Sequence, residues 1–183
     1  MNFIDLSIKQ EVNFLIDQVA LPKLEKLAVR SINIERIWQN QVAAMTCGIE
    51  NLMHLTLYNC MNLRCLFSSS TVSDNIFVRL QYIEIEKCHV LEELIVMDNQ
   101  EEERKNNIVM FPQLQYLKMY DLEKLTSFCT GDLDILEFPS LKELRISRCP
   151  EFMVRCTNIL TKKVKIYNQF FNSYARTVKI YVI

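Results

Sequence analysis

The sequence predicts an α/β fold built as a repeat solenoid, in which parallel β-strands stack side by side. An L-x-x-L-x-L pattern recurs along the chain, and 50% of the 183 residues are apolar while 23% are charged. One such unit cannot bury its apolar face alone, whereas stacked units close a continuous core and pair their backbones in a parallel sheet. The composition and the recurrence therefore favour a single solenoid domain.

The pattern L-x-x-L-x-L-x-x-(C/L/I) occurs five times, which exceeds the roughly three units that a stable solenoid needs. The five occurrences are Leu24-Leu27-Val29-Ile32, Leu52-Leu55-Leu57-Cys60, Leu80-Ile83-Ile85-Cys88, Leu114-Leu117-Met119-Leu122 and Leu141-Leu144-Ile146-Cys149. Their first residues are 28, 28, 34 and 27 positions apart. These intervals lie within or just beyond the roughly 20 to 29 residues typical of leucine-rich repeats. Residues 21–155 are thus predicted to form five leucine-rich repeats.

Each unit is expected to contribute one short strand, because its x-Leu-x-Leu-x core alternates with a period of two. The apolar residues that follow, such as Leu63, Leu91 and Phe128, would fill the core behind the strand. The predicted solenoid is a right-handed horseshoe arc with a parallel sheet on its concave face. Its convex side is expected to be irregular or to hold short helices.

Three segments depart from the repeat. Residues 1–20 are interpreted as a degenerate N-terminal repeat or cap, in which Ile4, Leu6 and Ile8 alternate as in a strand. The fourth interval is long because of an acidic loop insertion at about 98–109, interpreted as a solvated loop or, less simply, a charged docking loop. Residues 156–183 form an atypical basic tail without an acidic residue.

Two interpretations of the tail stay open. Val164-Lys165-Ile166-Tyr167 recurs as Val178-Lys179-Ile180-Tyr181, so the segment could form strands that cap the last repeat. An altered gene end is the alternative.

The net charge and the glycine content exclude several classes of function. Lys and Arg number 21 against 22 Asp and Glu, so no basic surface for nucleic acid or an anionic membrane is expected. With only 2 glycines, the chain cannot form a Gly-rich phosphate loop. The first twenty residues contain charges throughout, so neither a signal peptide nor a membrane-spanning helix is predicted.

The cysteines indicate a reducing compartment. Their number, 7, is odd, they form no C-x-x-C pair and follow no zinc-ligand spacing. No Asn-x-Ser/Thr glycosylation acceptor occurs. Free thiols in the cytoplasm are the simplest interpretation, and no metal site is expected.

Several phrases carry a closer resemblance. Three repeats begin with Leu21-Pro22-Lys23-Leu24, Phe111-Pro112-Gln113-Leu114 and Phe138-Pro139-Ser140-Leu141, and Leu63-Arg64-Cys65-Leu66-Phe67 follows a strand. Together with Ile34-Glu35-Arg36-Ile37-Trp38 and Leu91-Glu92-Glu93-Leu94-Ile95, they resemble the C-terminal leucine-rich repeats of plant coiled-coil nucleotide-binding disease resistance proteins.

The resemblance implies a cytoplasmic immune receptor, in which the repeats contribute to effector recognition and hold a nucleotide-binding switch closed. The implied partners are proteins: a pathogen effector, a guarded host protein or the receptor's own nucleotide-binding domain. The chain contains no G-x-x-x-x-G-K-[ST] loop, so the ATP or ADP site of that family is not carried over, and no cofactor is expected. The alternative is a stand-alone or truncated adaptor, such as a substrate-binding arm of a ubiquitin ligase.

Catalysis has no support in the sequence, because no catalytic phrase surrounds His54 or any serine or cysteine. Cys60, Cys88 and Cys149 share one repeat position and are expected to be buried structural residues. Trp38 is expected to lie in the core rather than to form a binding platform.

The positions between the strand leucines are predicted to face outward and to form the candidate site. They form three columns: Lys26, His54, Tyr82, Tyr116, Glu143; Ala28, Thr56, Glu84, Lys118, Arg145; and Arg30, Tyr58, Glu86, Tyr120, Ser147. Tyrosine offers a rigid apolar area with a polar tip and is enriched at protein interfaces. It is also simply a good strand former. The hypothesis is that Tyr58, Tyr82, Tyr116 and Tyr120 anchor a protein partner, flanked by Glu84, Glu86, Lys118 and Arg145.

Overall fold

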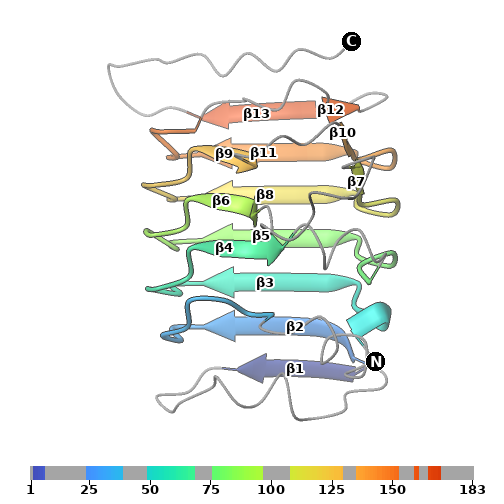
Figure 1. Ribbon diagram of the computed structural model, residues 1–183, viewed down its shortest axis with the longest axis horizontal. Coiled ribbons are helices and arrows are strands. Elements are labelled where there is room, and N and C mark those ends of the chain that lie inside the picture. Colours follow the sequence, from blue (N-terminus) through green and yellow to red (C-terminus); the bar gives the residue numbers. More distant parts are fainter. Residues whose placement is uncertain are drawn as a thin grey trace, which may run out of the picture.

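The computed structural model describes residues 2–6, 24–38, 49–68, 76–96, 108–129, 135–152, 159–160 and 165–169. A seven-stranded, wholly parallel sheet runs through it in the order β1-β2-β3-β5-β8-β11-β13. The strands are β1 (Asn2–Leu6), β2 (Leu24–Arg30), β3 (His54–Tyr58), β5 (Tyr82–Glu86), β8 (Tyr116–Tyr120), β11 (Glu143–Ser147) and β13 (Lys165–Gln169). All seven arrows point the same way in Figure 1. The predicted stack of parallel strands is confirmed.

The inner face of this long sheet carries the apolar residues of the repeat. Two inward residues per strand, from Leu27 and Val29 in β2 to Leu144 and Ile146 in β11, are at most 4% exposed. The pairing register is the one the repeat alignment requires, because Leu55 lies opposite Ile83 and Ile83 lies opposite Leu117. A slip of one residue would turn every leucine toward solvent, so burial itself fixes the register.

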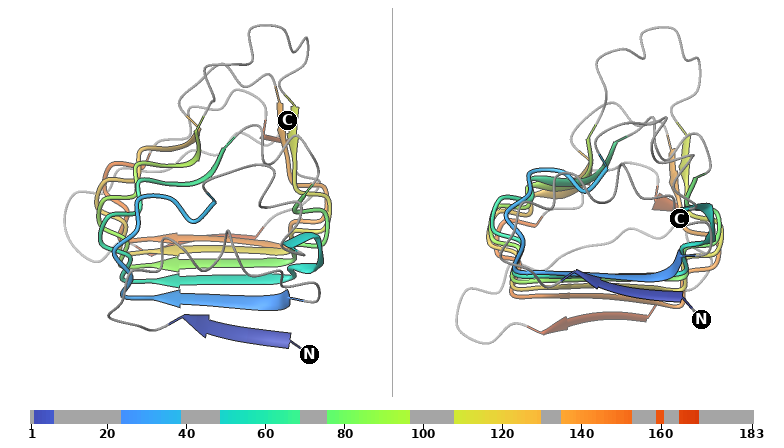
Figure 2. Two further views of the ribbon diagram at one scale, coloured as in Figure 1. Left: turned by 60° about the horizontal axis from the view of Figure 1, so that its bottom comes forward. Right: turned by 90° about the horizontal axis from the view of Figure 1, so that it is seen from below.

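The return side of the repeats is built from short strands, which the sequence did not predict. One sheet joins β4 (Cys65–Ser68), β6 (Glu93–Val96) and β9 (Ser127–Cys129), and another joins β7 (Ile108–Met110), β10 (Ile135–Glu137) and β12 (Ile159–Leu160). Viewed along the stack, the long sheet forms one side and these short strands the others (Figure 2). Within the described ranges the only helix is the 3-10 turn η2 (Ile49–Asn51), and this stack of parallel strands with almost no helix is consistent with the predicted leucine-rich repeat solenoid.

Aromatic rings run through the core from repeat to repeat. Trp38 contacts Phe77 at a centroid distance of 5.4 Å, and Phe77 contacts Phe67 at 4.7 Å. The chain of contacts continues through Phe111, Phe138, Phe128 and Phe152. The expectation that Trp38 belongs to the core is confirmed, since it is 7% exposed. Ring contacts of this kind add stability beyond the area that they bury.

The Phe-Pro-x-Leu phrases form turns that lead into the long sheet. The N–H of Leu114 donates to the carbonyl of Phe111, and that of Leu141 donates to the carbonyl of Phe138. Proline suits the second position of such a turn, because its ring fixes φ near the value that the turn needs. The motif therefore sets where strands β8 and β11 begin.

In the long sheet, the strands β2, β3, β5, β8 and β11 are each followed directly by a residue with positive φ. These residues are Ser31, Asn59, Lys87, Asp121 and Arg148, with φ between 54° and 57°. Each of the first four donates its N–H to the last strand residue of the next repeat, as Lys87 does to Tyr120 at 3.1 Å. The ladder of backbone hydrogen bonds thus continues one residue past the strands while the chain turns away.

Buried thiols close these turns. Cys60, Cys88 and Cys149 are at most 3% exposed, and each Sγ donates to the carbonyl two residues earlier, the shortest at 3.4 Å from Cys149 to Ser147. Burial raises the pKa of Cys149 to about 11, and a hydrogen bond with Cys60 together with burial raises that of Cys88. The expectation of structural cysteines at this position is confirmed.

Both ends of the described solenoid continue the long sheet. At one end β1 pairs with β2 through Ile4 and Leu6, where an alternating strand was expected. At the other, β13 lies within the basic tail and pairs with β11. Residues 98–107 of the predicted acidic insertion and the second copy of the tail repeat lie outside the described residues, whereas 108–110 form β7.

Candidate functional site

The outward positions of the long-sheet strands β2, β3, β5, β8 and β11 form one surface, which we call the open face. The three predicted columns are real rows in space, because Lys26, His54, Tyr82, Tyr116 and Glu143 are successive partners in the sheet register. The columns that contain Thr56 and Tyr58 are aligned in the same way. Every one of the eight predicted site residues therefore lies on the open face.

Three rings contact one another in the first column, and we call His54, Tyr82 and Tyr116 the aromatic row. His54 stacks on Tyr82 at a centroid distance of 5.6 Å, and Tyr82 meets Tyr116 at 6.2 Å with a tilt of 47°. Such pairs fall within the 4.5–7 Å range of favourable aromatic geometry. The row crosses three neighbouring strands and gives the open face a continuous apolar strip.

Charged neighbours hold Tyr82 in position. Its hydroxyl donates to Oε2 of Glu84 at 2.8 Å, and Nζ of Lys118 lies 5.1 Å from the centre of its ring. Burial, and then the hydrogen bond with the Glu84 carboxylate, raise the pKa of Tyr82 above its ordinary value. The ring is thus held from its hydroxyl edge and from one face.

A second polar group lies beside the row on β8 and β11. Nη2 of Arg145 forms an ion pair with Oε1 of Glu143 at 3.1 Å, and the guanidinium also hydrogen-bonds the hydroxyl of Tyr120. Burial raises the pKa of Tyr120, and the hydrogen bond from Arg145 opposes that rise. Charges on this part of the open face are therefore compensated locally.

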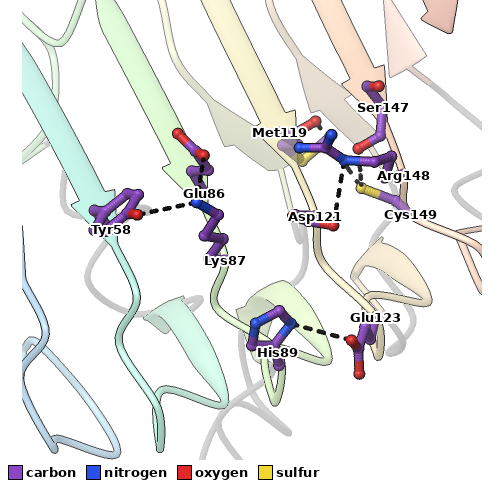
Figure 3. A network of polar contacts seen from close by, with 10 residues as sticks. All are labelled: Tyr58, Glu86, Lys87, His89, Met119, Asp121, Glu123, Ser147, Arg148 and Cys149. Carbon is purple, nitrogen blue, oxygen red and sulfur yellow. Dashed lines mark hydrogen bonds and ion pairs between the residues drawn. The ribbon is translucent and has the colours of Figure 1, made fainter.

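Tyr58 and Glu86 lie instead at the edge where the strands end, and Lys87 bridges them (Figure 3). Nζ of Lys87 donates to the Tyr58 hydroxyl at 3.0 Å and lies 3.5 Å from Oε1 of Glu86. The same Nζ lies 5.0 Å from the centre of the Tyr58 ring. The hydrogen bond to Tyr58 raises the pKa of Lys87. Further along this edge Nδ1 of His89 lies 3.4 Å from Oε1 of Glu123, and Arg148 forms an ion pair with Asp121 at 3.3 Å.

The structure thus divides the predicted site into two groups. It brings together Tyr82, Glu84, Tyr116, Lys118, Tyr120 and Arg145 around the row, and it sets Tyr58 and Glu86 apart at the turn edge. Three contributing residues were missed as site residues. His54 and Glu143 stand in the first column, where the period could have found them, whereas Lys87 lies past the strand and carried no periodic signal.

His54 stacks on Tyr82, and burial followed by the nearby charge of Lys26 lowers its pKa. Across the described ranges no cluster of three or more His, Cys, Asp or Glu side chains could hold a metal ion. The open face thus presents rings, locally paired charges and hydroxyls.

Comparison with known families identifies one match. The model for "Plant disease resistance protein RPS2-like, leucine-rich repeats" matches residues 23–165, which is most of the chain. No solved structure matches this chain. Leucine-rich repeat domains are protein-interaction modules. None of the described helical residues forms a helix that is long and apolar enough to span a membrane.

Proposed function

The chain belongs to the leucine-rich repeats of RPS2-like plant disease resistance proteins, and from this premise we propose that it recognises proteins for a plant immune receptor. The proposed partners are a pathogen effector, a guarded host protein or the receptor's own nucleotide-binding domain. In the last case the repeats hold the nucleotide switch closed. ATP or ADP would bind to that other module and not to these repeats.

One observation carries the proposal: the aromatic row and its fixed charges on the open face. Interface energy concentrates in large side chains that are already ordered and that lie beside groups able to exclude water. Tyr82 satisfies both conditions, since His54 and Glu84 hold its ring and its hydroxyl. We place this recognition in the cytoplasm, where buried thiols such as Cys88 would stay reduced.

Site-specific crosslinking in plant leaf cells tests the proposal. Tyr116 is replaced by a photoreactive phenylalanine analogue, and a matched variant carries the same analogue at Met61, which is 61% exposed on a turn away from the open face. Illumination is expected to crosslink Tyr116 to a discrete protein that mass spectrometry identifies, with a much lower yield from Met61. Equal yields from the two positions, or no crosslinked protein from Tyr116, would refute recognition through this face.

A further inference from the structure

We propose that the aromatic row binds an extended segment of a partner protein, whose acidic side chain pairs with Lys26 and whose apolar side chains pack on Tyr82 and Tyr116. This inference rests on the proposed function and deepens it, because it names the chemistry of the segment that is recognised. Lys26 stands directly before His54 in the first column, so the cation and the rings lie in one line.

Among the described residues of the open face, Lys26 is the cation that pairs with neither a carboxylate nor an aromatic ring. Arg30 lies 3.6 Å from Asp5, Lys118 lies over the Tyr82 ring, and Arg145 pairs with Glu143. No carboxylate of the described residues pairs with Lys26. A partly exposed ammonium beside an apolar strip is electrostatically complementary to a carboxylate that arrives with apolar neighbours.

The first column, which contains the aromatic row, also sets the length and direction of the bound segment. From Lys26 to Glu143 the first column crosses β2, β3, β5, β8 and β11, which are successive neighbours in the sheet. Four spacings between parallel strands amount to about 19 Å, which an extended chain covers in about six residues. The segment would run across the strands with its acidic residue at the β2 end. At the other end the Glu143 carboxylate is already paired with Arg145.

Single-stranded nucleic acid could in principle stack its bases on the same rings. The charges argue against it, because Glu84 lies 2.8 Å from the Tyr82 hydroxyl and Glu143 follows Tyr116 in the column. Phosphates along the row would meet these carboxylates, and among the described residues of the open face only Lys26 and Lys118 are cations without a carboxylate partner. A chain with widely spaced acidic groups and apolar side chains fits the pattern better.

A random six-residue peptide library, sorted on the purified full chain, tests the inference. Selected peptides are expected to carry one Asp or Glu near one end, followed by aromatic or leucine residues. For the best peptide, Lys26→Glu should weaken binding by about tenfold, and replacing the peptide's acid by Lys should restore binding to this variant. The matched change Lys124→Glu, on an exposed turn, should leave the affinity within twofold. An oligothymidine of similar length should not compete.

His54 gives an independent readout by NMR. A carboxylate beside Lys26 offsets the positive charge that helps to lower the pKa of His54, so bound peptide should raise the pKa of this imidazole. The groups around it are Lys26 from β2 and Tyr82 from β5, and His89 on the turn edge serves as the internal reference.

Several outcomes would overturn the inference: no enriched peptide, enrichment of Lys or Arg, equal effects of Lys26→Glu and Lys124→Glu, or binding of oligothymidine to the row. Failure of this inference is distinguishable from failure of the proposed function. If Tyr116 still crosslinks to a discrete protein while no acidic peptide binds, the chain recognises a folded surface rather than an extended segment. If both experiments fail, recognition through the open face falls as well.

Discussion

The two faces of the same strands differ in how their residues make contacts. In β8, Leu117 and Met119 are fully buried in the apolar core, whereas Tyr116 and Lys118 are half-exposed and contact Tyr82. Inner residues of different strands are interchangeable in kind, since leucine, isoleucine, valine and methionine all occur there. Outer residues are not interchangeable in this way, because rings and charges such as those of Tyr82 and Arg145 contact particular neighbours. The inner face therefore carries the fold, and the open face carries the specific ring and charge contacts on which the proposed recognition rests.

The largest expected effect tests the inner face. Leu117→Ala should lower the free energy of unfolding by about 2 to 5 kcal/mol, because it removes a fully buried side chain and leaves a cavity between repeats. Urea unfolding measures the change. The adjacent Lys118→Ala is the control and should cost well under about 1 kcal/mol. A Leu117→Ala chain as stable as the original would contradict the register of the sheet.

On the return side, a substitution is expected to raise the free energy of unfolding by a smaller amount. Ser127 in β9 is fully buried, and its hydroxyl has no hydrogen-bond partner within the described ranges. Ser127→Ala should therefore stabilise the fold by about 1 kcal/mol, since an unsatisfied polar group is removed. Thr126→Ala is the matched change: it deletes a hydroxyl that donates to the Glu92 carbonyl at 3.1 Å and should not stabilise. Equal effects of the two variants in thermal melts would argue against the packing of β9.

Alkaline pH tests the fixed geometry of the open face. Because the pKa of Tyr82 is raised in the folded state, the folded chain keeps this proton where the unfolded chain loses it. The stability that this proton contributes to the folded state is complete below about pH 10 and is lost as the pH rises beyond that value. Tyr82→Phe should cost about 1 kcal/mol at neutral pH and flatten the alkaline loss of stability. Tyr116→Phe, which keeps its ring contact with Tyr82, is the control, and an unchanged alkaline slope in Tyr82→Phe would count against the Glu84 bond.

The smallest effect concerns the turns that end the strands. Ser31 has a φ of 54°, which side chains with a Cβ disfavour. Ser31→Gly should raise the free energy of unfolding by about 0.5 kcal/mol. Loss of the hydrogen bond that Nδ2 of Asn59 donates to the Ser31 hydroxyl at 3.2 Å reduces this gain. The same substitution at Thr56, inside β3, should instead destabilise. If both changes destabilise the fold equally, the positive φ of Ser31 does not cost stability, and the account of this turn is wrong.

The repeat alignment predicted the register of the long sheet, the inward leucines and the cysteine position, because all three follow from a period that burial enforces. Other features follow from no period. Strands such as Cys65–Ser68 and Ser127–Cys129 are short and have no polar alternation, so only their neighbours in the stack reveal them as sheets. The contact of Lys87 with Tyr58 depends on a turn that aims the lysine back across the sheet edge. The columns could thus be predicted, but not which of their members touch.

Recognition through the open face is tested most directly by the affinity for the protein crosslinked at Tyr116. The variant Tyr58→Ser, Tyr82→Ser, Tyr116→Ser, Tyr120→Ser should keep a cooperative unfolding transition and lose affinity by at least about a hundredfold, because interface energy concentrates in large aromatic anchors. If the fourfold variant unfolds, Tyr116→Ser alone should still weaken binding by about tenfold. A folded variant that binds this protein as tightly as the original chain would contradict the assignment of recognition to the open face.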